Sequence, residues 1–530
     1  MENIKNIKKH TIRFLPSGLP IDVADGTTVM DAARKAGVFI NAPCGGDGKC
    51  LKCTVEVTSD GVTTTQLACR YKVTSDIDVT APEKTASKIA ESGTARKAKP
   101  LLSEMISKNI EIRGIEHPLV MAFDIGTTTV VGYLISAESG ETISTVSRMN
   151  PQAQYGADVI KRAEYAMQSG GEALSRIIKD AVSDMIGEAV SLAGADRQNI
   201  ALVMLAGNTC MNHLFMGFPV RRLVTAPYKP AQNYSPVITA AECGINDSGY
   251  AAWLPNIDGF VGSDTVAVLL DVEMDKLEKP SLILDIGTNG EVAAGDRNRY
   301  IVCSTAAGPA FEGVGISCGM RAFTGAIDRA EITPDGVELG VIGGGKPRGI
   351  CGTGLLDVVA AMLKHGVIDE SGRFSDEDEL PEYLRAMVTG DGAERRLVLA
   401  RGSDSASGKE IAVTQKDVRE VQLAKAAIAA GVKTVLRELH ILFSQLDGVM
   451  LSGAFGNYAS EESLCTVGLL PRECAGKIAH IGNAAGEGAK LAAINYNEYK
   501  RAVKIAENAE YLELATNKTF QELYIEEMAF

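Results

Sequence analysis

The sequence lacks three features that would place it in a familiar class. No run approaches 18 apolar residues, so we expect no membrane-spanning helix. The first five residues, Met1-Glu2-Asn3-Ile4-Lys5, begin no apolar segment, so we expect no secretory signal. Positive charge is not in excess, because 53 Lys and Arg stand against 67 Asp and Glu, for a net charge of −14. That balance argues against nucleic acid or an anionic membrane as the main partner.

What remains is typical of a large globular protein. The 530 residues predict about three to four domains, and 45% of them are hydrophobic and 23% charged. Eleven cysteines in a chain without a secretory signal favour metal ligation in a reducing cytoplasm over a disulfide framework.

Four cysteines near the beginning of the sequence carry the strongest chemical signal. Cys44, Cys50, Cys53 and Cys69 have the spacing C-x5-C-x2-C-x15-C, and the first three lie in a glycine-rich loop. Glycine tolerates positive φ and leaves N–H groups that can face sulfur. The spacing is close to the plant-type [2Fe–2S] run, with one extra residue in the first gap. We therefore predict that these four side chains hold a [2Fe–2S] cluster that carries single electrons. A zinc site is the alternative, but zinc knuckles usually take two C-x2-C pairs and only one is present.

Residues 1–81 predict a small β-rich domain around this loop. The predicted strands span 10–15, 20–23, 53–57 and 76–79. A helix is predicted from the capping-box-like start at Thr28 to Gly37. This order of elements resembles the β-grasp [2Fe–2S] ferredoxins, and the short gap before Cys69 predicts a trimmed excursion. Residues 82–118 are then rich in small and polar side chains, which predicts a mobile linker.

The rest of the sequence contains a repeat. An apolar strand from Leu119 ends in Asp124-Ile125-Gly126-Thr127-Thr128-Thr129, and another from Ser281 ends in Asp285-Ile286-Gly287-Thr288-Asn289-Gly290. Each is followed by a predicted helix, over 171–190 and 415–440, and by a second apolar strand. Those later strands run into Gly207-Asn208 and Gly453-Ala454-Phe455-Gly456-Asn457. Two signals repeated in the same order predict duplicated α/β halves, 119–262 and 263–530, with 331–401 inserted in the second.

The chemistry of the repeated turns points to a nucleotide. A strand-end aspartate, here Asp124 or Asp285, can reach Mg²⁺ directly or through water, and glycine lets the backbone approach phosphate. The groups predicted to bind phosphate oxygens are on Gly126, Thr127, Thr128 and Thr129 in the first turn and on Gly287, Thr288 and Asn289 in the second. One such turn alone is also ordinary hairpin chemistry, but two related turns are more specific.

These turns resemble the two phosphate motifs of the superfamily of acetate and sugar kinases, heat-shock chaperone ATPases and actin. An RNase H-like (actin-type) ATPase fold is therefore expected. The run 449–457 resembles the adenosine motif of that superfamily, in which the small residues Gly453, Ala454, Gly456 and Asn457 would let a purine lie against the backbone. Lys425, on the preceding helix, is a further candidate for nucleotide contact, with a solvated lysine as the alternative. No G-x-x-x-x-G-K-[ST] run occurs, which excludes a P-loop NTPase.

Three further segments are conspicuous, at 155–158, 306–313 and 349–354. The last is a glycine cluster before an apolar segment, which predicts a helix N-terminus facing phosphate. Tight turn packing is the alternative for each.

The sequence thus predicts one multidomain α/β chain, in which a β-grasp [2Fe–2S] domain is joined through a linker to a duplicated ATPase fold. This combination resembles the reductive activators of corrinoid proteins. The resemblance covers nearly the whole sequence, through the cysteine loop, both aspartate turns, 304–313 and 453–457. It implies that ATP is used to reduce an inactive Co(II) corrinoid methyl-carrier protein to Co(I). A plant-type cluster sits near about −400 mV, and the cobalt couple is expected to be lower, so this electron transfer is uphill. We hypothesise that nucleotide binding or hydrolysis closes the two halves and thereby alters binding of the corrinoid partner.

Two other functions stay open at this point. One is an ATP-dependent activator like those of 2-hydroxyacyl-CoA dehydratases, which hold a [4Fe–4S] cluster through a Cys-Ala-Ala-Gly-Thr-Gly segment. The run Cys351-Gly352-Thr353-Gly354 is faintly similar, but no further cysteine occurs until Cys465. The other is a redox-sensing regulator with a vestigial nucleotide fold, against which both aspartates and both hydroxyl-rich turns argue. An upstream low-potential electron donor is expected, and the acidic surface is compatible with a homodimer.

Overall fold

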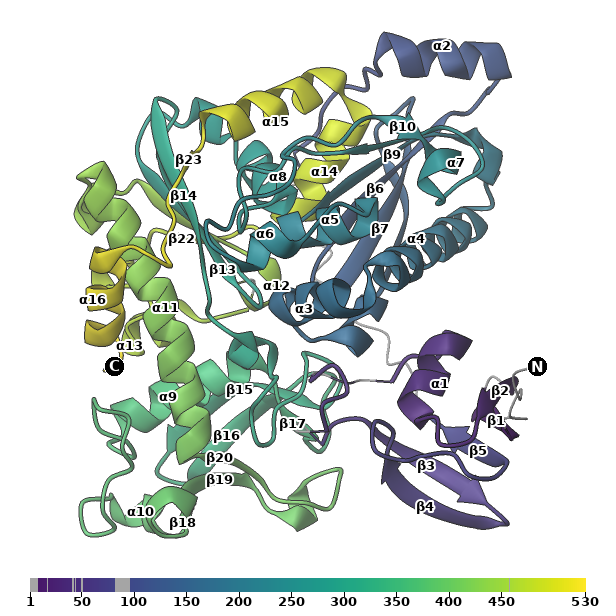
Figure 1. Cartoon of the computed structure of the whole chain (residues 1–530). Coiled ribbons are helices and arrows are strands. Elements are labelled where there is room, and N and C mark those ends of the chain that lie inside the picture. Colours follow the sequence, from purple (N-terminus) through teal and green to yellow (C-terminus); the bar gives the residue numbers. More distant parts are fainter. Residues whose placement is uncertain are drawn as a thin grey trace. The chain divides into compact units, whose positions relative to one another are not determined.

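The computed structural model of the chain describes residues 8–16, 18–40, 42, 44–48, 51–81, 96–456 and 458–530. The predicted site residues Cys50 and Asn457 lie outside these ranges. The backbone forms two compact units (Figure 1). The first comprises Met1–Ala86 and Glu104–Trp253, and the second comprises Ser87–Ser103 and Leu254–Phe530.

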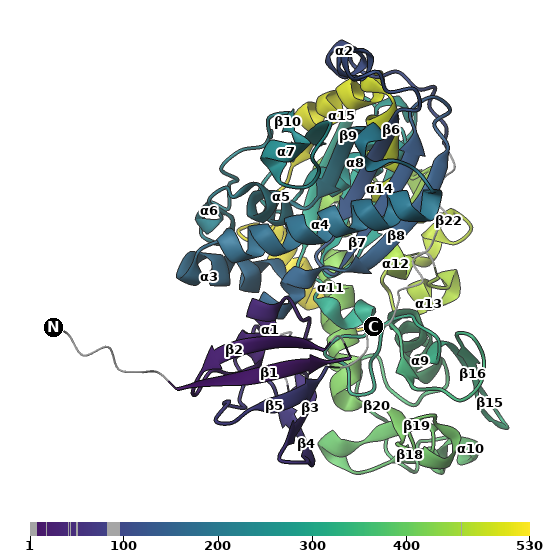
Figure 2. The same cartoon turned by 90° about the vertical axis from the view of Figure 1, so that its right-hand side faces the viewer.

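The first unit begins with a five-stranded β-grasp sheet in the order β2-β1-β5-β3-β4 (Figure 2). Its elements are β1 (Lys9–Leu15), β2 (Leu19–Ala24), α1 (Val29–Ala36), β3 (Thr54–Ser59), β4 (Val62–Leu67) and β5 (Ile77–Thr80). As predicted, Thr28 caps α1 by accepting a hydrogen bond from the Asp31 N–H, and Gly37 ends the helix at φ +68°. The apolar face of α1 packs with Ile12 and Phe14 in the core of this domain.

The segment before Cys69, predicted to be a trimmed excursion, contains a strand, β4, that the sequence pattern did not predict. It pairs antiparallel with β3 from Ser59↔Val62 to Thr54↔Leu67. The side chains from Val62 to Thr65 are exposed, so the strand lacks the alternation of apolar residues by which strands are recognised. Only the turn is visible in the sequence, at Asp60-Gly61, where both residues have positive φ.

The first half of the ATPase fold is a six-stranded sheet in the order β10-β11-β9-β6-β7-β8. Its strands are β6 (Leu119–Ile125), β7 (Thr129–Ser136), β8 (Thr142–Met149), β9 (Ile200–Gly207), β10 (Ile238–Thr239) and β11 (Tyr250–Trp253). Its helices are η1 (Pro151–Tyr155), α3 (Val159–Ser169), α4 (Glu172–Ala193), η2 (Arg197–Asn199), α5 (Thr209–Met216), α6 (Arg221–Val224) and α7 (Ala240–Cys243). Helix α4 packs across β7 and β8 (Figure 2).

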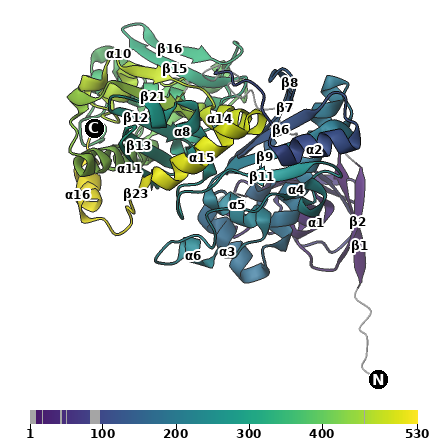
Figure 3. The same ribbon diagram turned by 90° about the horizontal axis from the view of Figure 1, so that it is seen from above.

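The second half has a sheet of the same size, in the order β22-β21-β12-β13-β14-β23. Its strands are β12 (Ser281–Ile286), β13 (Gly290–Asp296), β14 (Arg299–Thr305), β21 (Gly448–Ser452), β22 (Ile478–His480) and β23 (Glu510–Tyr511). Its helices are α8 (Ser263–Asp271), η3 (Met274–Lys276), η4 (Pro309–Glu312), α11 (Gln415–Leu439), η7 (Phe443–Gln445), α12 (Gly453–Gly456), α13 (Glu461–Thr466), η8 (Arg472–Cys474), α14 (Ala484–Ile494), α15 (Tyr496–Asn508) and α16 (Lys518–Glu526). Helices α8, α14 and α15 pack on one another (Figure 3).

The two sheets confirm the predicted duplication. The order β9-β6-β7-β8 in the first corresponds to β21-β12-β13-β14 in the second, and α11 packs across β13 and β14 as α4 does across β7 and β8. In both, the strand that ends in aspartate is parallel to the later strand. Asp124 pairs in register with Ala206, and Asp285 pairs with Ser452. Each half therefore brings its aspartate turn beside the end of its glycine-rich strand.

The insertion in the second half is larger than predicted, because its elements begin at Ala326 and end at Thr414, just before α11. Its elements are β15 (Ala326–Thr333), β16 (Gly336–Val341), β17 (Gly349–Ile350), α9 (Gly352–Lys364), α10 (Glu382–Arg385), β18 (Val388–Thr389), η5 (Gly392–Glu394), β19 (Arg396–Ala400), η6 (Gly402–Asp404) and β20 (Ile411–Thr414). They form two three-stranded sheets, β16-β15-β17 and β18-β19-β20.

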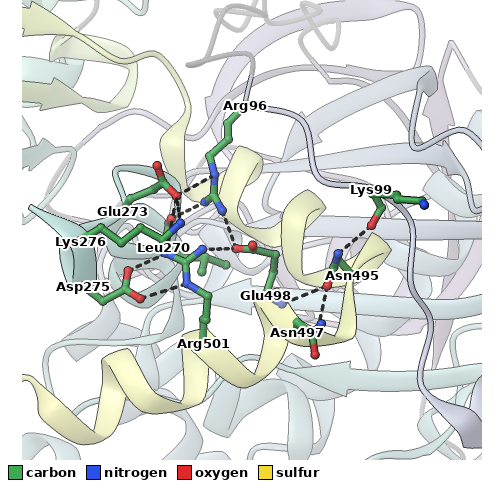
Figure 4. Close-up of polar contacts among 10 residues, drawn as sticks. All are labelled: Arg96, Lys99, Leu270, Glu273, Asp275, Lys276, Asn495, Asn497, Glu498 and Arg501. Carbon is green, nitrogen blue, oxygen red and sulfur yellow. Dashed lines mark hydrogen bonds and ion pairs between the residues drawn. The ribbon is translucent and has the colours of Figure 1, made fainter.

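The predicted linker is only partly a linker. Residues 82–95 lie outside the described ranges, but 96–103 are fixed to the second unit (Figure 4). Arg96 donates to Leu270 O at 2.8 Å and to Glu498 Oε2 at 2.7 Å. The Lys99 carbonyl accepts from Asn495 at 2.7 Å. Helix α2 (Glu104–Arg113) follows and belongs to the first unit. The small, polar composition predicted mobility, but ion pairs with residues far away in the sequence hold this segment.

Among the described residues, no helix has the length and apolar character needed to cross a bilayer.

Candidate cluster and nucleotide sites

The cysteine loop follows α1 and leads into β3. The Sγ atoms of Cys53 and Cys69 are 3.3 Å apart, much farther than the S–S bond of about 2.05 Å in a disulfide. Gly45, Gly46 and Gly48 all have positive φ, which a side chain would disfavour. The described part of the loop therefore has the close thiols and the backbone freedom that the predicted cluster needs.

Burial, together with the neighbouring Cys53 and Cys44, raises the pKa of Cys69 to about 11 and so favours its neutral thiol. Thiolates ligate metals, and a bound cation reverses this preference. No group of three or more His, Cys, Asp or Glu side chains meets metal-site geometry within the described residues, a set that omits Cys50.

The first aspartate turn lies at the end of β6. A Cβ at Gly126 would be 2.7 Å from the Thr129 carbonyl oxygen, so the turn closes only with glycine. Three consecutive carbonyls accept hydrogen bonds from the protein. Asn150 donates to Gly126 O through Nδ2 at 2.8 Å and to Thr128 O through its backbone N–H at 2.9 Å. Arg162 donates to Thr127 O at 2.5 Å. These bonds tie the turn to Asn150 and Arg162.

The hydroxyl of Thr127 is oriented by the glycine-rich strand of the same half. Asn208 follows β9 and donates through Nδ2 to Thr127 Oγ1 at 2.9 Å. Its Oδ1 accepts from the Met211 N–H at 3.0 Å and so caps α5. Because Thr127 Oγ1 already accepts this bond, its own proton can point outward toward a phosphate oxygen. The repeated Gly-Asn signal in the sequence marked this residue without revealing its role.

In the second half, carboxylates crowd around the end of β12. Asp285 stands opposite Glu291 on β13 in the strand register. The pKa of Asp285 is raised to about 6, because the effect of burial outweighs the lowering by the Ser452 hydroxyl. Burial, with the charges of Asp264 and Asp285, raises the pKa of Glu291 well above its usual range. A cation would relieve this repulsion, and carboxylate oxygens are the ligands that Mg²⁺ prefers.

Glu312 is a candidate site residue that was not predicted from the sequence. It ends η4, within the conspicuous run 306–313, and its Oε1 accepts a hydrogen bond of 2.7 Å from Thr288 Oγ1. Arg321 lies close enough for its charge to interact with Glu312, and burial lowers the pKa of that guanidinium. Within the turn itself, the Gly287 N–H donates to Asn289 O at 2.9 Å. The second turn therefore differs from the first, because its threonine hydroxyl donates to a carboxylate.

The run resembling an adenosine motif lies beside Asp285. A Cβ at Gly453 would be 2.7 Å from Asp285 Oδ1, and Gly453 has φ +86°. Phe455 stacks on Phe311 with ring centroids 4.4 Å apart, and a Cβ at Gly456 would be 3.2 Å from Leu451. The small residues thus make room for the carboxylate and for core packing. Whether Gly453, Ala454 and Gly456 also receive a purine stays a prediction.

Lys425 is neither solvated nor oriented for a ligand. Its side chain is buried, and its ammonium group donates to Glu527 O at 3.0 Å, Glu527 Oε2 at 3.3 Å and Ala529 O at 2.8 Å. These three bonds match the three donors of a lysine. The expectation of a solvated lysine is wrong, and the geometry offers no support for nucleotide contact by this residue.

The glycine cluster at 349–354 does begin a helix, α9, but backbone closes its N-terminus. A Cβ at Gly352 would be 1.7 Å from Phe311 O, and one at Gly354 would be 2.1 Å from Ile327 O. Cys351 is buried, and its thiol lies 3.2 Å from Ile327 O. Tight packing therefore accounts for this motif, and the similarity to a dehydratase-activator cluster ligand loses its basis.

Comparison with known proteins agrees with this architecture. Residues 12–74 match the model of a 2Fe–2S iron–sulfur cluster binding domain, 119–277 match the RACo middle region, and 279–530 match the C-terminal domain of RACo, the ASKHA domain. The fold and the sites therefore define a class of protein in which a [2Fe–2S] domain is joined to an ASKHA domain. The ASKHA domain supports nucleotide binding.

Three similar proteins identify the family to which the chain belongs. The corrinoid activation enzyme RamQ of Eubacterium limosum is 33% identical over 95% of this chain and 96% of its own. The [Co(II) methylated amine-specific corrinoid protein] reductase of Methanosarcina barkeri is 27% identical over 77% of this chain and 76% of its own. The solved structure of a reductive activator for corrinoid, iron-sulfur protein has a TM-score of 0.73 and 27% identity, and covers 98% of both chains. The chain belongs to the family of reductive activators of corrinoid proteins.

Proposed function

We propose that this protein is an ATP-dependent reductive activator. It passes one electron from its [2Fe–2S] cluster to a corrinoid methyl-carrier protein in the inactive Co(II) state, which becomes Co(I). The observation that carries this proposal is the presence, in one chain, of paired thiols in a glycine-rich loop and two aspartate turns in equivalent strand registers. The names of the relatives, an activation enzyme and a Co(II) corrinoid protein reductase, support the same activity.

Different residues of the chain would serve the cluster and the ATP site. Cys44, Cys50, Cys53 and Cys69 would hold the cluster, which supplies a one-electron carrier when bound. Asp124 and Asp285 would position Mg²⁺ at the ATP phosphates, with Thr127 donating to a phosphate oxygen. A low-potential electron donor would reduce the cluster beforehand. A homodimer and a cytoplasmic location stay predictions.

The ATP half of the proposal is tested by Asp285→Asn in anaerobically purified protein. The carboxamide keeps the shape but removes the charge, so we expect ATP turnover to fall at least about 100-fold. The EPR spectrum of the reduced cluster should not change. Asp447→Asn, which alters an exposed carboxylate paired with Lys279, is the matched control. Normal turnover by Asp285→Asn would remove Asp285 from the site.

The cluster half is tested by analysis of iron and acid-labile sulfide. We expect two of each per chain and a rhombic [2Fe–2S] signal in the reduced state, both diminished by Cys69→Ser. Zinc without sulfide, or four irons in one cluster, would contradict the assignment of these cysteines.

A further inference from the structure

A single arginine joins the cluster loop to the first half of the ATPase fold, within the first unit. Arg34 lies on α1, and its Nη2 donates to Gly45 O in the cluster loop at 2.7 Å. The same nitrogen donates to Gln154 O in η1 at 2.6 Å. Its guanidinium carbon also lies 4.8 Å from the centroid of the Tyr155 ring, within the range of a cation–π contact. Arg34 therefore holds two backbone segments that are far apart in the sequence.

The cluster loop and η1 also pack directly on each other. Gly45 has φ +68°, and a Cβ at this position would lie 2.9 Å from the Tyr155 carbonyl oxygen. The Tyr155 ring is buried, with the Tyr165 ring 4.7 Å away. The loop predicted to carry the cluster thus rests on a well-packed surface, and this contact explains the conspicuous segment that begins at residue 155.

The opposite end of η1 holds the phosphate turn. Asn150, the residue before η1, is buried and bonds to Gly126 O and Thr128 O. Arg162, also buried, donates to Thr127 O at 2.5 Å and to Gly156 O, just after η1, at 2.9 Å. The carbonyls of Gly126 and Thr128 are therefore held by Asn150, which directly precedes η1. The carbonyl of Thr127 is held by Arg162, which also bonds to the residue that follows η1.

We propose that Arg34 docks the cluster loop on η1 and that this docking is coupled to nucleotide binding at the Gly126–Thr128 turn. This inference rests on the proposed function, because it assumes that the turn binds ATP. A turn that adjusts to phosphate must carry η1 with it, since buried, close-packed contacts shift as a unit. Coupling of this kind is reciprocal, so the docked and undocked ferredoxin domains must differ in nucleotide affinity.

Arg34→Ala and Arg70→Ala provide a matched pair. Arg70 supports the same cluster loop, donating to Gly48 O at 2.6 Å, but this bond stays inside the ferredoxin domain. In full-length anaerobic protein with its cluster, we would measure binding of the β,γ-imido analogue of ATP with Mg²⁺. We would also measure amide hydrogen exchange at 126–129 and 150–156 without nucleotide. Arg34→Lys, which keeps the charge but loses the fork geometry, distinguishes lost docking from misfolding.

We expect Arg34→Ala to change the affinity by at least about 5-fold, the lower limit of typical coupling, and to change exchange at 126–129. Arg70→Ala should do neither, and all variants should keep the wild-type cluster EPR spectrum. Equal affinity and equal exchange in the two alanine variants would overturn the coupling. If the wild-type protein fails to bind the analogue, the proposed function fails, and the exchange at 126–129 alone then decides whether docking and turn are linked.

Discussion

Thr288 donates a hydrogen bond of 2.7 Å to Glu312. Thr127, its counterpart in the other half, instead accepts one of 2.9 Å from Asn208. The threonine hydroxyls of the duplicated turns therefore have opposite hydrogen-bonding roles toward the protein, since Thr127 accepts a bond and Thr288 donates one. The two copies share one backbone arrangement but differ in the side chains that orient these hydroxyl groups.

We predict that Glu312→Gln slows ATP hydrolysis by about 10²- to 10⁴-fold, the usual contribution of a positioned acid or base. The amide oxygen can still accept from Thr288, but it cannot take a proton from water. Nucleotide affinity should change far less than turnover. Glu338→Gln, at an exposed position on β16, is the control. Turnover at the wild-type rate in Glu312→Gln would exclude Glu312 from the reaction.

Asn208→Asp separates the two bonds of that side chain. The carboxylate retains the cap on α5 but loses the donor to Thr127 and adds a negative charge. We expect nucleotide affinity to fall at least about 5-fold with little loss of stability. Asn208→Ala removes the cap as well and should cost about 1 kcal/mol of unfolding free energy. Calorimetric titration and thermal denaturation measure the two effects, and unchanged affinity in Asn208→Asp would contradict the role of Thr127 as a donor.

Arg96→Ala tests whether residues 96–103 are fixed. The side chains of Arg96 and Glu498 are 19% and 14% exposed, so their bond is partly shielded from water. Hydrogen bonds to charged groups contribute about 1.5–3 kcal/mol, so amide exchange over 96–103 should accelerate about 10- to 100-fold. Lys279→Ala breaks an ion pair whose side chains are 71% and 55% exposed and should leave this exchange unchanged. Exchange that is already fast in the wild type would argue for a free linker.

His213 makes stability depend on pH. Burial lowers its pKa from 6.5 to about 4, and its ring nitrogens contact Thr209 O at 2.9 Å and the Ala231 N–H at 3.0 Å. Between these pKa values the unfolded chain binds more protons than the folded one, so stability falls as pH drops from about 6.5 to 4. The loss attributable to this residue is about 3 kcal/mol. Urea denaturation of His213→Gln should show a lower stability at pH 7 and a shallower pH dependence. An equal pH dependence in both proteins would contradict this assignment.

Local patterns in the sequence were enough to predict the duplicated halves. Strands β6 and β12 are buried along most of their length and end in glycine turns, and Thr414 with Asp417 forms a capping box at the start of the predicted helix α11. These signals lie within a few residues of one another, so no long-range contact is needed to recognise them.

Contacts that are distant in the sequence could not be predicted. Lys425 is buried by a segment about a hundred residues later, and Arg96 is held by Glu498. Glu312 reaches Thr288 only because η4 returns to the turn, and Arg34 meets Gln154 only in the folded unit. In each case a polar residue of ordinary appearance acquires its role from the tertiary fold.

The central claim is tested most directly by mixing the reduced protein anaerobically with a Co(II) corrinoid methyl-carrier protein and following the cobalt absorption with and without Mg²⁺-ATP. The account predicts that Co(I) forms only when ATP is present, and that Asp285→Asn forms none. Equal Co(I) formation without ATP, or no Co(I) under any condition with a range of such carriers, would contradict it.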